Sequence, residues 1–288
     1  MKIPILHLEQ FEQTQAQTFY ISRLSDHLFT KRNLVHKTHS HSFYLGVLFT
    51  QGKGIHEIDF NAYTIQPGSF FLLKPGQTHN WKFDDPPEGI IFFHSKAFFK
   101  LNYIQHNFNL FPFYQSNLNP PFLKLNQKET EKINSELIEL KQEFHSNQLF
   151  KELQILNSLN SIYILLSRLY LKDIEPSLLK AKPNTKLLTD LERLIETHFK
   201  QEKLPRFYAA QLHTTTKNLN RIVQKNLGKT TSDLIAERIV LEAKRLIVHA
   251  ELSLSEIAYT LGFSDYSYFS RFFKQKSGTS PLQFKNKF

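Results

Sequence analysis

LSEIAYTLGFSDYSYFSRFFKQKSGTSPLQF, residues Leu254–Phe284, is the stretch that decides the fold of the C-terminal part of this chain. Just before and inside it, Ser253 and Glu256 have the spacing of a capping box, in which each side chain bonds a backbone amide at a helix start. Gly262 stands where that short helix must end in a left-handed conformation, which costs glycine little. A second helix is expected over residues 265 to about 276. Two helices joined by a short glycine-containing turn predict a helix-turn-helix unit.

The second helix of this unit has two different faces. Ser264 is its expected N-cap, and its inner side is expected to bury three phenylalanines. The residues expected on its outer face are Tyr266, Ser267, Ser270, Arg271 and Lys274. Residues near the start of such a helix meet base edges in the major groove. There an arginine can bind guanine with two hydrogen bonds, the serines can hydrogen-bond, and a tyrosine ring can pack on a thymine methyl. Lys274, further along, suits a phosphate.

The unit occurs twice. Leu219–Arg221 returns as Phe269–Arg271, and Gly228 returns as Gly278, each fifty residues later. The helix before each is matched at an offset of forty-nine, so the second copy has one extra residue in or after its turn. Two copies are too few for a solenoid and indicate a duplicated supersecondary unit.

The first copy follows the same logic. Pro205 suits the first turn of its leading helix, and Thr215 is the expected cap of its second helix. The residues expected on the outer face are Lys217, Asn218, Arg221 and Gln224. Asn218 can bind adenine with two hydrogen bonds, as Arg221 can guanine. His213 replaces the turn glycine of the second copy, which predicts a looser turn.

Charge concentrates in this part of the chain. Residues 183–288 hold 17 Lys/Arg and 10 Asp/Glu, a net charge of +7 out of +10 for the whole chain. Such an excess suits a polyanion, because neutralised phosphates release counterions; a solvated basic surface is the alternative. A helix over about 232–248, ~25 Å long, can space the two reading helices toward successive major-groove faces about 34 Å apart.

Residues 186–288 resemble the DNA-binding domain of AraC/XylS-type regulators. The resemblance rests on Leu254–Phe284 and on RIVLEAKRLI, Arg238–Ile247. It implies a bacterial, seven-helix domain that binds two successive major-groove segments of double-stranded DNA near a promoter, where RNA polymerase becomes a further expected partner. The chain departs from the pattern at His213 and at Thr214–Thr216, which leaves the base contacts of the first unit less defined.

The N-terminal part has a different texture, with short apolar runs separated by Gly- and Pro-containing turns. The expected strands are Thr18–Leu24, Phe43–Thr50, Ile55–Phe60, Ala62–Ile65, Phe70–Leu73 and Gly89–Phe93. Their length and close spacing predict an antiparallel sandwich or barrel. From about Gln127 the pattern becomes helical, with apolar residues every three or four positions.

His39-Ser40-His41 and Lys74–His79 resemble the two motifs of cupin barrels, which AraC-type regulators often carry as sensors. One hypothesis is a metal site of His39, His41 and His79. The carboxylate that cupin metalloenzymes place soon after the paired histidines is missing here, so the preferred prediction is a metal-free pocket without a cofactor. In it the three histidines, with Tyr44 and Trp81, would bind a small organic molecule; core packing is the alternative for some of them.

The expected fold class is multidomain α+β, with a cupin-like antiparallel β-barrel, following helices and an all-α double helix-turn-helix domain. A leucine-rich helix over Leu149–Leu169 is predicted to support a homodimer, the alternative being an internal brace. The expected boundaries are 1–126 for the sensing barrel with its N-terminal arm, 127–170 for the dimerisation helices, 171–185 for the linker and 186–288 for the DNA-binding domain, with helix-turn-helix units at about 205–226 and 254–276.

Composition excludes several classes of function. The chain has no cysteine, which excludes disulfides, thiolate zinc sites and thiol catalysis. No stretch resembles a signal peptide or a transmembrane span, so a cytoplasmic location without membrane contact is expected. The sequence therefore predicts a non-enzymatic transcription regulator controlled by an unidentified small-molecule effector. The competing hypotheses are a cupin-type metalloenzyme with an incidental basic domain, and a DNA binder without a ligand.

Overall fold

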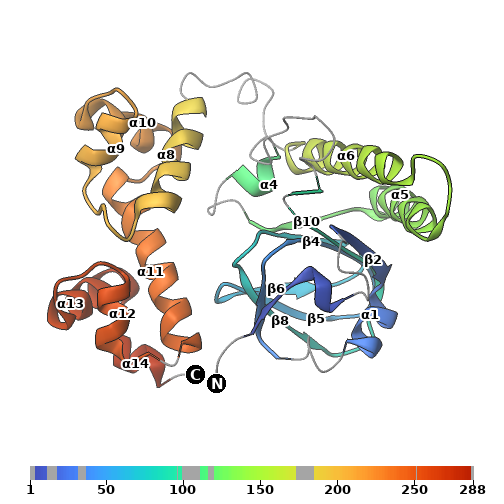
Figure 1. Cartoon of the computed structure of the whole chain (residues 1–288), viewed down its shortest axis with the longest axis horizontal. Coiled ribbons are helices and arrows are strands. Elements are labelled where there is room, and N and C mark those ends of the chain that lie inside the picture. The colour runs from blue at the N-terminus through green and yellow to red at the C-terminus, as the bar shows by residue number, and fades with distance from the viewer. Residues whose placement is uncertain are drawn as a thin grey trace. The chain divides into compact units, whose positions relative to one another are not determined.

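The computed structural model describes residues 4–11, 18–31, 37–95, 97–98, 111–115, 120–172, 185–250 and 252–286. The described residues up to 172 form one compact unit, and those from 185 onward form a second (Figure 1). Most of the predicted linker, 171–185, lies outside the described residues. The two units are therefore treated separately below.

The N-terminal unit is built on two five-stranded sheets. The first, in spatial order, contains β1 (Ile5–Leu6), β3 (His39–His41), β8 (Thr78–Phe83), β5 (Gly54–Ile58) and β6 (Asn61–Ile65). The second contains β10 (Phe122–Lys124), β7 (Ser69–Leu73), β4 (Tyr44–Gln51), β9 (Glu88–His94) and β2 (Phe19–Arg23). All neighbours pair antiparallel except β1 and β3. The predicted antiparallel sheet domain is confirmed, whereas the strands β3 and β8, which carry His39, His41 and His79, were not predicted from the sequence.

Two apolar cores share the second sheet. Odd-numbered residues of β4 and β9, such as Val47 and Phe93, point into the space between the sheets. Even-numbered ones, such as Leu48 and Phe92, point to the helical side, because side chains alternate along a strand. The helices of this unit are η1 (Leu8–Gln10), α1 (Leu24–Thr30), α4 (Pro112–Gln115), α5 (Gln127–His145) and α6 (Lys151–Tyr170). Figure 1 shows α5 and α6 covering one face of the sandwich.

The leucine stripe of α6 belongs to this second core. Leu156, Leu159 and Leu166 are fully buried there with Ile162 and Tyr163. The stripe therefore braces the sheet of its own chain, which is the alternative that the sequence had left open. Leu149 precedes α6 and is 82% exposed.

The described residues of the C-terminal unit form seven helices, the number that the resemblance implied. They are α8 (Thr185–His198), α9 (Pro205–Gln211), α10 (Thr216–Leu227), α11 (Thr231–His249), α12 (Leu254–Thr260), α13 (Tyr266–Ser277) and α14 (Pro281–Lys285). Helix α11 packs against α8 and α10 and also against α12, α13 and α14, so it joins two helix-turn-helix units into one body (Figure 1).

The duplication extends beyond the residues that revealed it. Helices α10 and α13 both end at a left-handed glycine, Gly228 with φ 67° and Gly278 with φ 82°. Two residues later, Thr230 and Ser280 each begin the next helix with a capping box. The repeat therefore includes the stop of each reading helix and the start of the helix that follows.

An ion cluster around the buried Arg238 fixes α8 to α11. Arg238, whose side chain is 9% exposed, donates to both carboxylate oxygens of Glu196 at 2.7 and 2.8 Å and to Glu242 at 2.9 Å. Its guanidinium also lies 4.1 Å from the centroid of the Phe199 ring. Removing a partner of such a cluster would leave a buried charge unpaired, which is costly.

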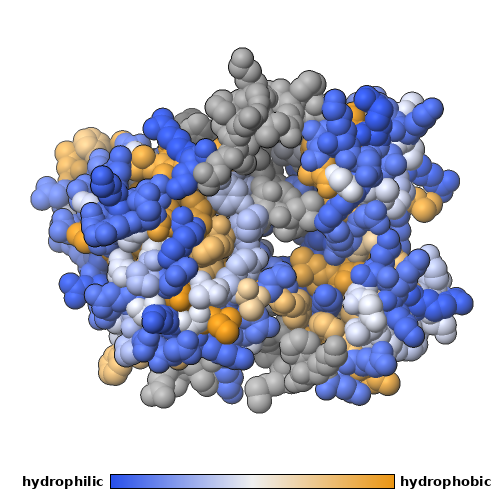
Figure 2. Space-filling model, turned by 180° about the vertical axis from the view of Figure 1, so that it is seen from behind, coloured by the Kyte–Doolittle hydropathy of each residue, from blue (hydrophilic) through white to orange (hydrophobic). Residues whose placement is uncertain are grey.

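The surface is mainly hydrophilic on the face drawn in Figure 2, with separate hydrophobic patches. Leu149 and Phe150 are the most exposed large aliphatic and aromatic side chains of the α5–α6 connection. Among the described helices, none combines the length and the apolar character needed to cross a membrane.

Candidate functional site

The two helix-turn-helix units close their turns in the same way. In the first, the amide of Thr214 donates to the carbonyl of Ala209 at 2.9 Å; in the second, Phe263 donates to Ala258 at 3.0 Å. His213 has φ 50°, the same left-handed region as its counterpart glycine. The prediction of a looser first turn is therefore wrong, because the histidine adopts the strained conformation that the hydrogen bonds demand.

The extra residue of the second copy lies after its turn. Asp265, not Ser264, is the N-cap of α13, and its carboxylate accepts from the amide of Tyr268 at 2.8 Å. The structure corrects the predicted cap by one residue. A carboxylate suits this position because it satisfies a free amide and complements the positive end of the helix.

The predicted reading faces are accessible on both helices. Three pairs related by the fifty-residue offset are exposed: Lys217 with Ser267, Arg221 with Arg271, and Gln224 with Lys274. In each helix these positions follow the spacing i, i+4 and i+7, which is one continuous face. The buried residues between them, such as Leu219 and Phe269, hold the helix to its domain.

The remaining predicted contacts, Asn218, Tyr266 and Ser270, are half-buried. Asn218 donates to the hydroxyl of Thr214 at 2.9 Å and accepts from Arg221 at 2.9 Å, so its amide holds the arginine in place. Sequence reasoning missed Tyr268, which is 51% exposed. The fifty-residue offset that pairs it with Asn218 was the signal that would have identified it.

The second turn is also tied to the first half of the domain. The ammonium of Lys203 donates to the carbonyls of Lys200 and Gly262 at 2.6 and 2.8 Å and lies over the Phe263 ring. A Cβ on Gly262 would lie 2.0 Å from the Lys200 carbonyl oxygen. Glycine is therefore required here both for φ and for the close approach of a neighbouring backbone.

The predicted ligand residues are only partly brought together. His39, His41 and His79 lie between the two sheets and are 0, 3 and 1% exposed. Their ring centroids are 4.4–4.8 Å apart, since His39 and His79 face each other across β3 and β8. Trp81, two residues along β8, lies 4.8 Å from His79.

Tyr44 does not belong to this group. Its ring stacks on His94 at 5.1 Å and meets Tyr114 at 4.9 Å, on the helical side of the second sheet. The predicted site is corrected accordingly. Sequence reasoning also missed His56, which is fully buried, lies opposite Trp81 and contacts His79. Gly54, His56 and Ile58 occupy alternate positions of β5, and this alternation was the sequence signal that places His56 on the inner face.

Burial sets the charge of these imidazoles. Desolvation, reinforced by the neighbouring imidazoles, holds the pKa of His41, His56 and His79 well below the usual range. Burial also lowers the pKa of His39, although its bond to the Lys37 carbonyl opposes the shift. All four rings are therefore neutral near pH 7 and keep a lone pair for a ligand.

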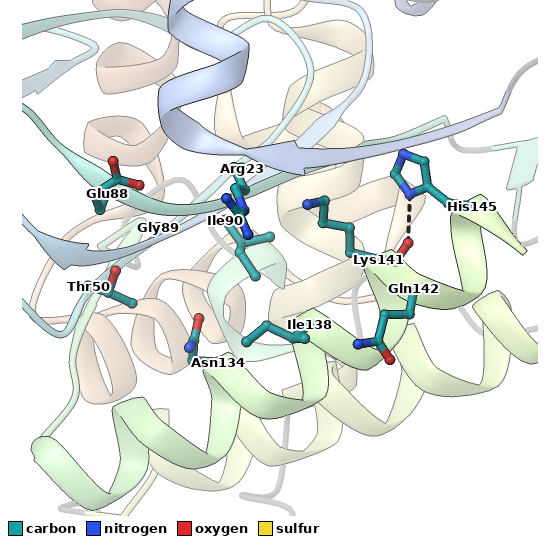
Figure 3. Close-up of a pocket in the computed structure, with 10 residues that line it drawn as sticks. All are labelled: Arg23, Thr50, Glu88, Gly89, Ile90, Asn134, Ile138, Lys141, Gln142 and His145. Carbon is teal, nitrogen blue, oxygen red and sulfur yellow. Dashed lines mark hydrogen bonds between the residues drawn. The ribbon is translucent and has the colours of Figure 1, made fainter.

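A pocket of about 430 Å³ opens between α5 and the outer side of the second sheet. We name it the α5 pocket; its lining comprises Arg23, Thr50, Glu88, Gly89, Ile90, Asn134, Ile138, Lys141, Gln142 and His145. Figure 3 shows the side chains of Arg23 and Lys141 extending toward each other across it. Within the described part of the chain neither forms an ion pair, and Ile90 and Ile138 supply an apolar surface beside them.

Comparison with known proteins connects both units to one family. Residues 208–287 match the family described as a helix-turn-helix domain, and residues 27–95 match the AraC-like ligand binding domain. The chain is an AraC-type regulator. The first match covers both helix-turn-helix units except the first three residues of α9, and the second contains all four clustered histidines. This regulator thus has a DNA-binding domain and a ligand-binding domain.

The regulator is similar along most of its length to curated transcriptional activators. It is 26% identical over 246 residues to the HTH-type transcriptional activator RhaS of Escherichia coli O81 (strain ED1a), covering 84% of this chain and 85% of that protein. The RhaS of Salmonella arizonae is 25% identical over 247 residues, with the same coverage. ToxT from Vibrio cholerae O395 is a structural neighbour at 15% identity and TM-score 0.42, covering 94% of this chain and 98% of that one.

Proposed function

We propose that this regulator reads two successive segments of the major groove with α10 and α13, under the control of a small molecule bound in its N-terminal domain. The carrying observation is the pair of matched exposed faces, each centred on an arginine held by the same scaffold. Arg221 and Arg271 would each bind a guanine. Asn218 would exchange its hydrogen bonds to Thr214 and Arg221 for an adenine. Lys217, Gln224, Tyr266, Ser267, Ser270 and Lys274 would supply the remaining base and phosphate contacts.

The length of helix α11 supports reading of two separate major-groove segments by α10 and α13. Its 19 residues span about 28 Å at 1.5 Å per residue. With the turns at its ends it suits the separation of about 34 Å between major-groove faces on one side of the duplex. The ion cluster around Arg238 would keep the two readers in fixed register.

The effector would be a small organic anion with an apolar part, bound in the α5 pocket. Two cations that extend toward each other repel unless an anion lies between them. The isoleucines beside them would cover the apolar part. At about 430 Å³ the pocket has the size of ordinary ligand sites. The histidine cluster, the site predicted from sequence, is closed to solvent and stays a prediction for an organic ligand.

Homodimerisation belongs to the same proposal. Leu149, Phe150 and Leu153, at the start of α6, are 82, 71 and 44% exposed. A second copy would bury this apolar surface, and an effector bound against α5 would act close to it. A ligand controls DNA binding only by its differential affinity for two arrangements. Sedimentation of Leu149→Ser/Phe150→Ser beside wild type tests the contact: a dimer reduced to monomer supports it, and an unchanged mass rejects it.

The main experiment selects binding sites from random DNA with the full-length protein and repeats the selection with a library of organic anions. The proposal expects a sequence-specific site whose occupancy changes with one class of anion. Arg23→Gln/Lys141→Gln should abolish that response, while His145→Ala, which leaves both of these cations in place, should retain it. Sequence-blind binding would favour a ligand-independent architectural role, and turnover of a substrate would favour the metalloenzyme.

The proposed DNA partner implies where in the cell the regulator works. A regulator that binds promoter DNA works in the cytoplasm of a bacterium, where RNA polymerase is a candidate second partner. A pull-down of RNA polymerase on promoter DNA, with and without the regulator, tests that contact.

A further inference from the structure

Two lysines join the halves of the C-terminal unit by polar bonds that the duplication does not repeat. Lys203, between α8 and α9, bonds the turn that precedes α13. Lys276, in the last turn of α13, bonds Asp233 in the first turn of α11. At the offsets of 49 and 50 residues the two lysines correspond to Leu252 and Asn226, which carry no charge. Both bonds are therefore additions to the repeated scaffold.

The bond of Lys203 holds the start of α13. Its ammonium lies between two backbone carbonyls, those of Lys200 at 2.6 Å and Gly262 at 2.8 Å, and the Phe263 ring lies 4.8 Å from it. Lys200 follows α8, the helix that Arg238 fixes to α11. The turn before α13 is thus tied through one ammonium to the first half of the domain.

The bond of Lys276 holds the end of α13. Nζ of Lys276 donates to one carboxylate oxygen of Asp233 at 2.9 Å, and the other oxygen accepts from the amide and hydroxyl of Thr230 at 3.2 and 2.6 Å. The bonds from Lys276 and Thr230 lower the pKa of Asp233 to about 2, so the carboxylate is charged at neutral pH. The last turn of α13 is thereby tied to the start of α11, which follows α10 in the chain.

Bonds at both ends of α13 restrict movements that its apolar packing does not. The helix packs against α11, and its buried residues, Phe269 and Phe273, are apolar. Apolar burial is non-directional, so it permits a small slide or rotation of the helix, whereas hydrogen bonds constrain distance and angle. One base-pair step moves a groove by about 3.4 Å along the duplex and by about 35° around it. The position of α13 against α11 therefore decides which spacing of half-sites both helices reach together.

We propose that Lys203 and Lys276 are positioning residues that set the spacing between the two half-sites that the regulator accepts. This role rests on the proposed function, because it acts on the reading of DNA by α10 and α13. Neither lysine would contact a base, since the ammonium of each is bonded to the protein's own oxygens. They would fix the separation of the two arginines that do.

The first measurement needs no DNA. The chain has no cysteine, so Lys225→Cys/Gln275→Cys places one spin label at equivalent exposed positions of α10 and α13 in the full-length protein. Double electron–electron resonance should give a narrow distribution of label distances. Adding Lys203→Met/Lys276→Met should widen it at an unchanged circular dichroism spectrum. Lys229→Met removes an ion pair that does not involve α13, so this matched control should leave the distribution narrow.

The second measurement uses duplexes that carry the selected half-sites at the selected spacing, or one base pair closer or further apart. Wild type should bind each altered spacing about tenfold more weakly, the loss expected for one base contact. Lys203→Met/Lys276→Met should lose most of this discrimination and keep the base preferences within each half-site. Lys276→Arg, which preserves the ion pair, should keep the discrimination.

A purely stabilising role of the lysines predicts a different result. The double variant would then bind every spacing more weakly by the same factor, with an unchanged distance distribution, and either outcome would overturn the proposal. Should the double variant fail to fold, Lys276→Met alone serves, because that side chain is 35% exposed and contributes little to stability. If wild type selects no two-part site, the proposed function fails, and the distance distribution still decides whether the lysines fix α13.

Discussion

The first and second helix-turn-helix units share a scaffold and differ in what they expose. Turn hydrogen bonds, caps and buried positions recur, as with Thr230 and Ser280 or Leu219 and Phe269. Of the exposed positions only the central arginine recurs. Lys217 and Gln224 of the first copy are replaced by Ser267 and Lys274 at the equivalent positions of the second. The duplication thus preserves the positions that fold the unit and varies those that we propose to contact DNA. We infer that the two units read different sequences.

The largest expected effect is on the unfolding free energy, at the left-handed glycines of the second unit. Gly262→Ala would force a left-handed alanine, which costs about 1–2 kcal/mol, and place its Cβ against the Lys200 carbonyl. We expect a loss of more than about 2 kcal/mol in the unfolding free energy, a fall in melting temperature of roughly 10 °C. Gly278→Ala, whose Cβ would meet open space, should lose only about 1 kcal/mol. Equal losses by urea denaturation would reject the role of the close approach.

The two equivalent arginines should contribute to specific DNA binding in the same way. Arg221→Ala and Arg271→Ala should each weaken specific binding by about 1–3 kcal/mol and relax one base preference apiece. Arg193→Ala, an exposed arginine on α8 outside both reading helices, is the control. Fluorescence anisotropy on specific and random DNA measures the ratio, and an unchanged ratio in both variants would remove α10 and α13 from the groove.

Exchanging the residues that differ between the two helices should transfer base specificity from one helix to the other. Ser267→Lys/Lys274→Gln gives α13 the flanking residues of α10 and should shift the selected bases of the second half-site toward those of the first. The expected change is about 1 kcal/mol or more in preference between the two half-sites. A selected site identical to that of wild type would show that these flanking residues do not read bases.

The smallest effect concerns the strained first turn. His213→Gly removes a left-handed side chain at φ 50° and should stabilise the domain by about 0.5 kcal/mol, the strain relieved less the entropy that glycine adds. Thermal unfolding of the variant checks the sign. Destabilisation would mean that the His213 side chain makes a contact that outweighs the strain of its backbone.

The sequence predicted best what depends on local spacing. Caps, helix faces and the fifty-residue repeat are set within a few residues, so the double helix-turn-helix was readable, although the α13 cap was misplaced by one residue. Tyr44 was misassigned because the run YLGVLF is apolar on both faces of β4, which hides the alternation that decides direction. His56 and the α5 pocket depend on the register of strands and helices distant in sequence, and no local pattern carries that register.

One measurement tests the central claim most directly. Site selection with wild type should yield two different half-sites whose centres lie about 10 base pairs apart, one turn of the duplex. Arg221→Ala should flatten the preference within one half-site only, and Arg271→Ala within the other only. A single undivided site, or loss of the same bases in both variants, would contradict reading by two helices at successive segments of the major groove.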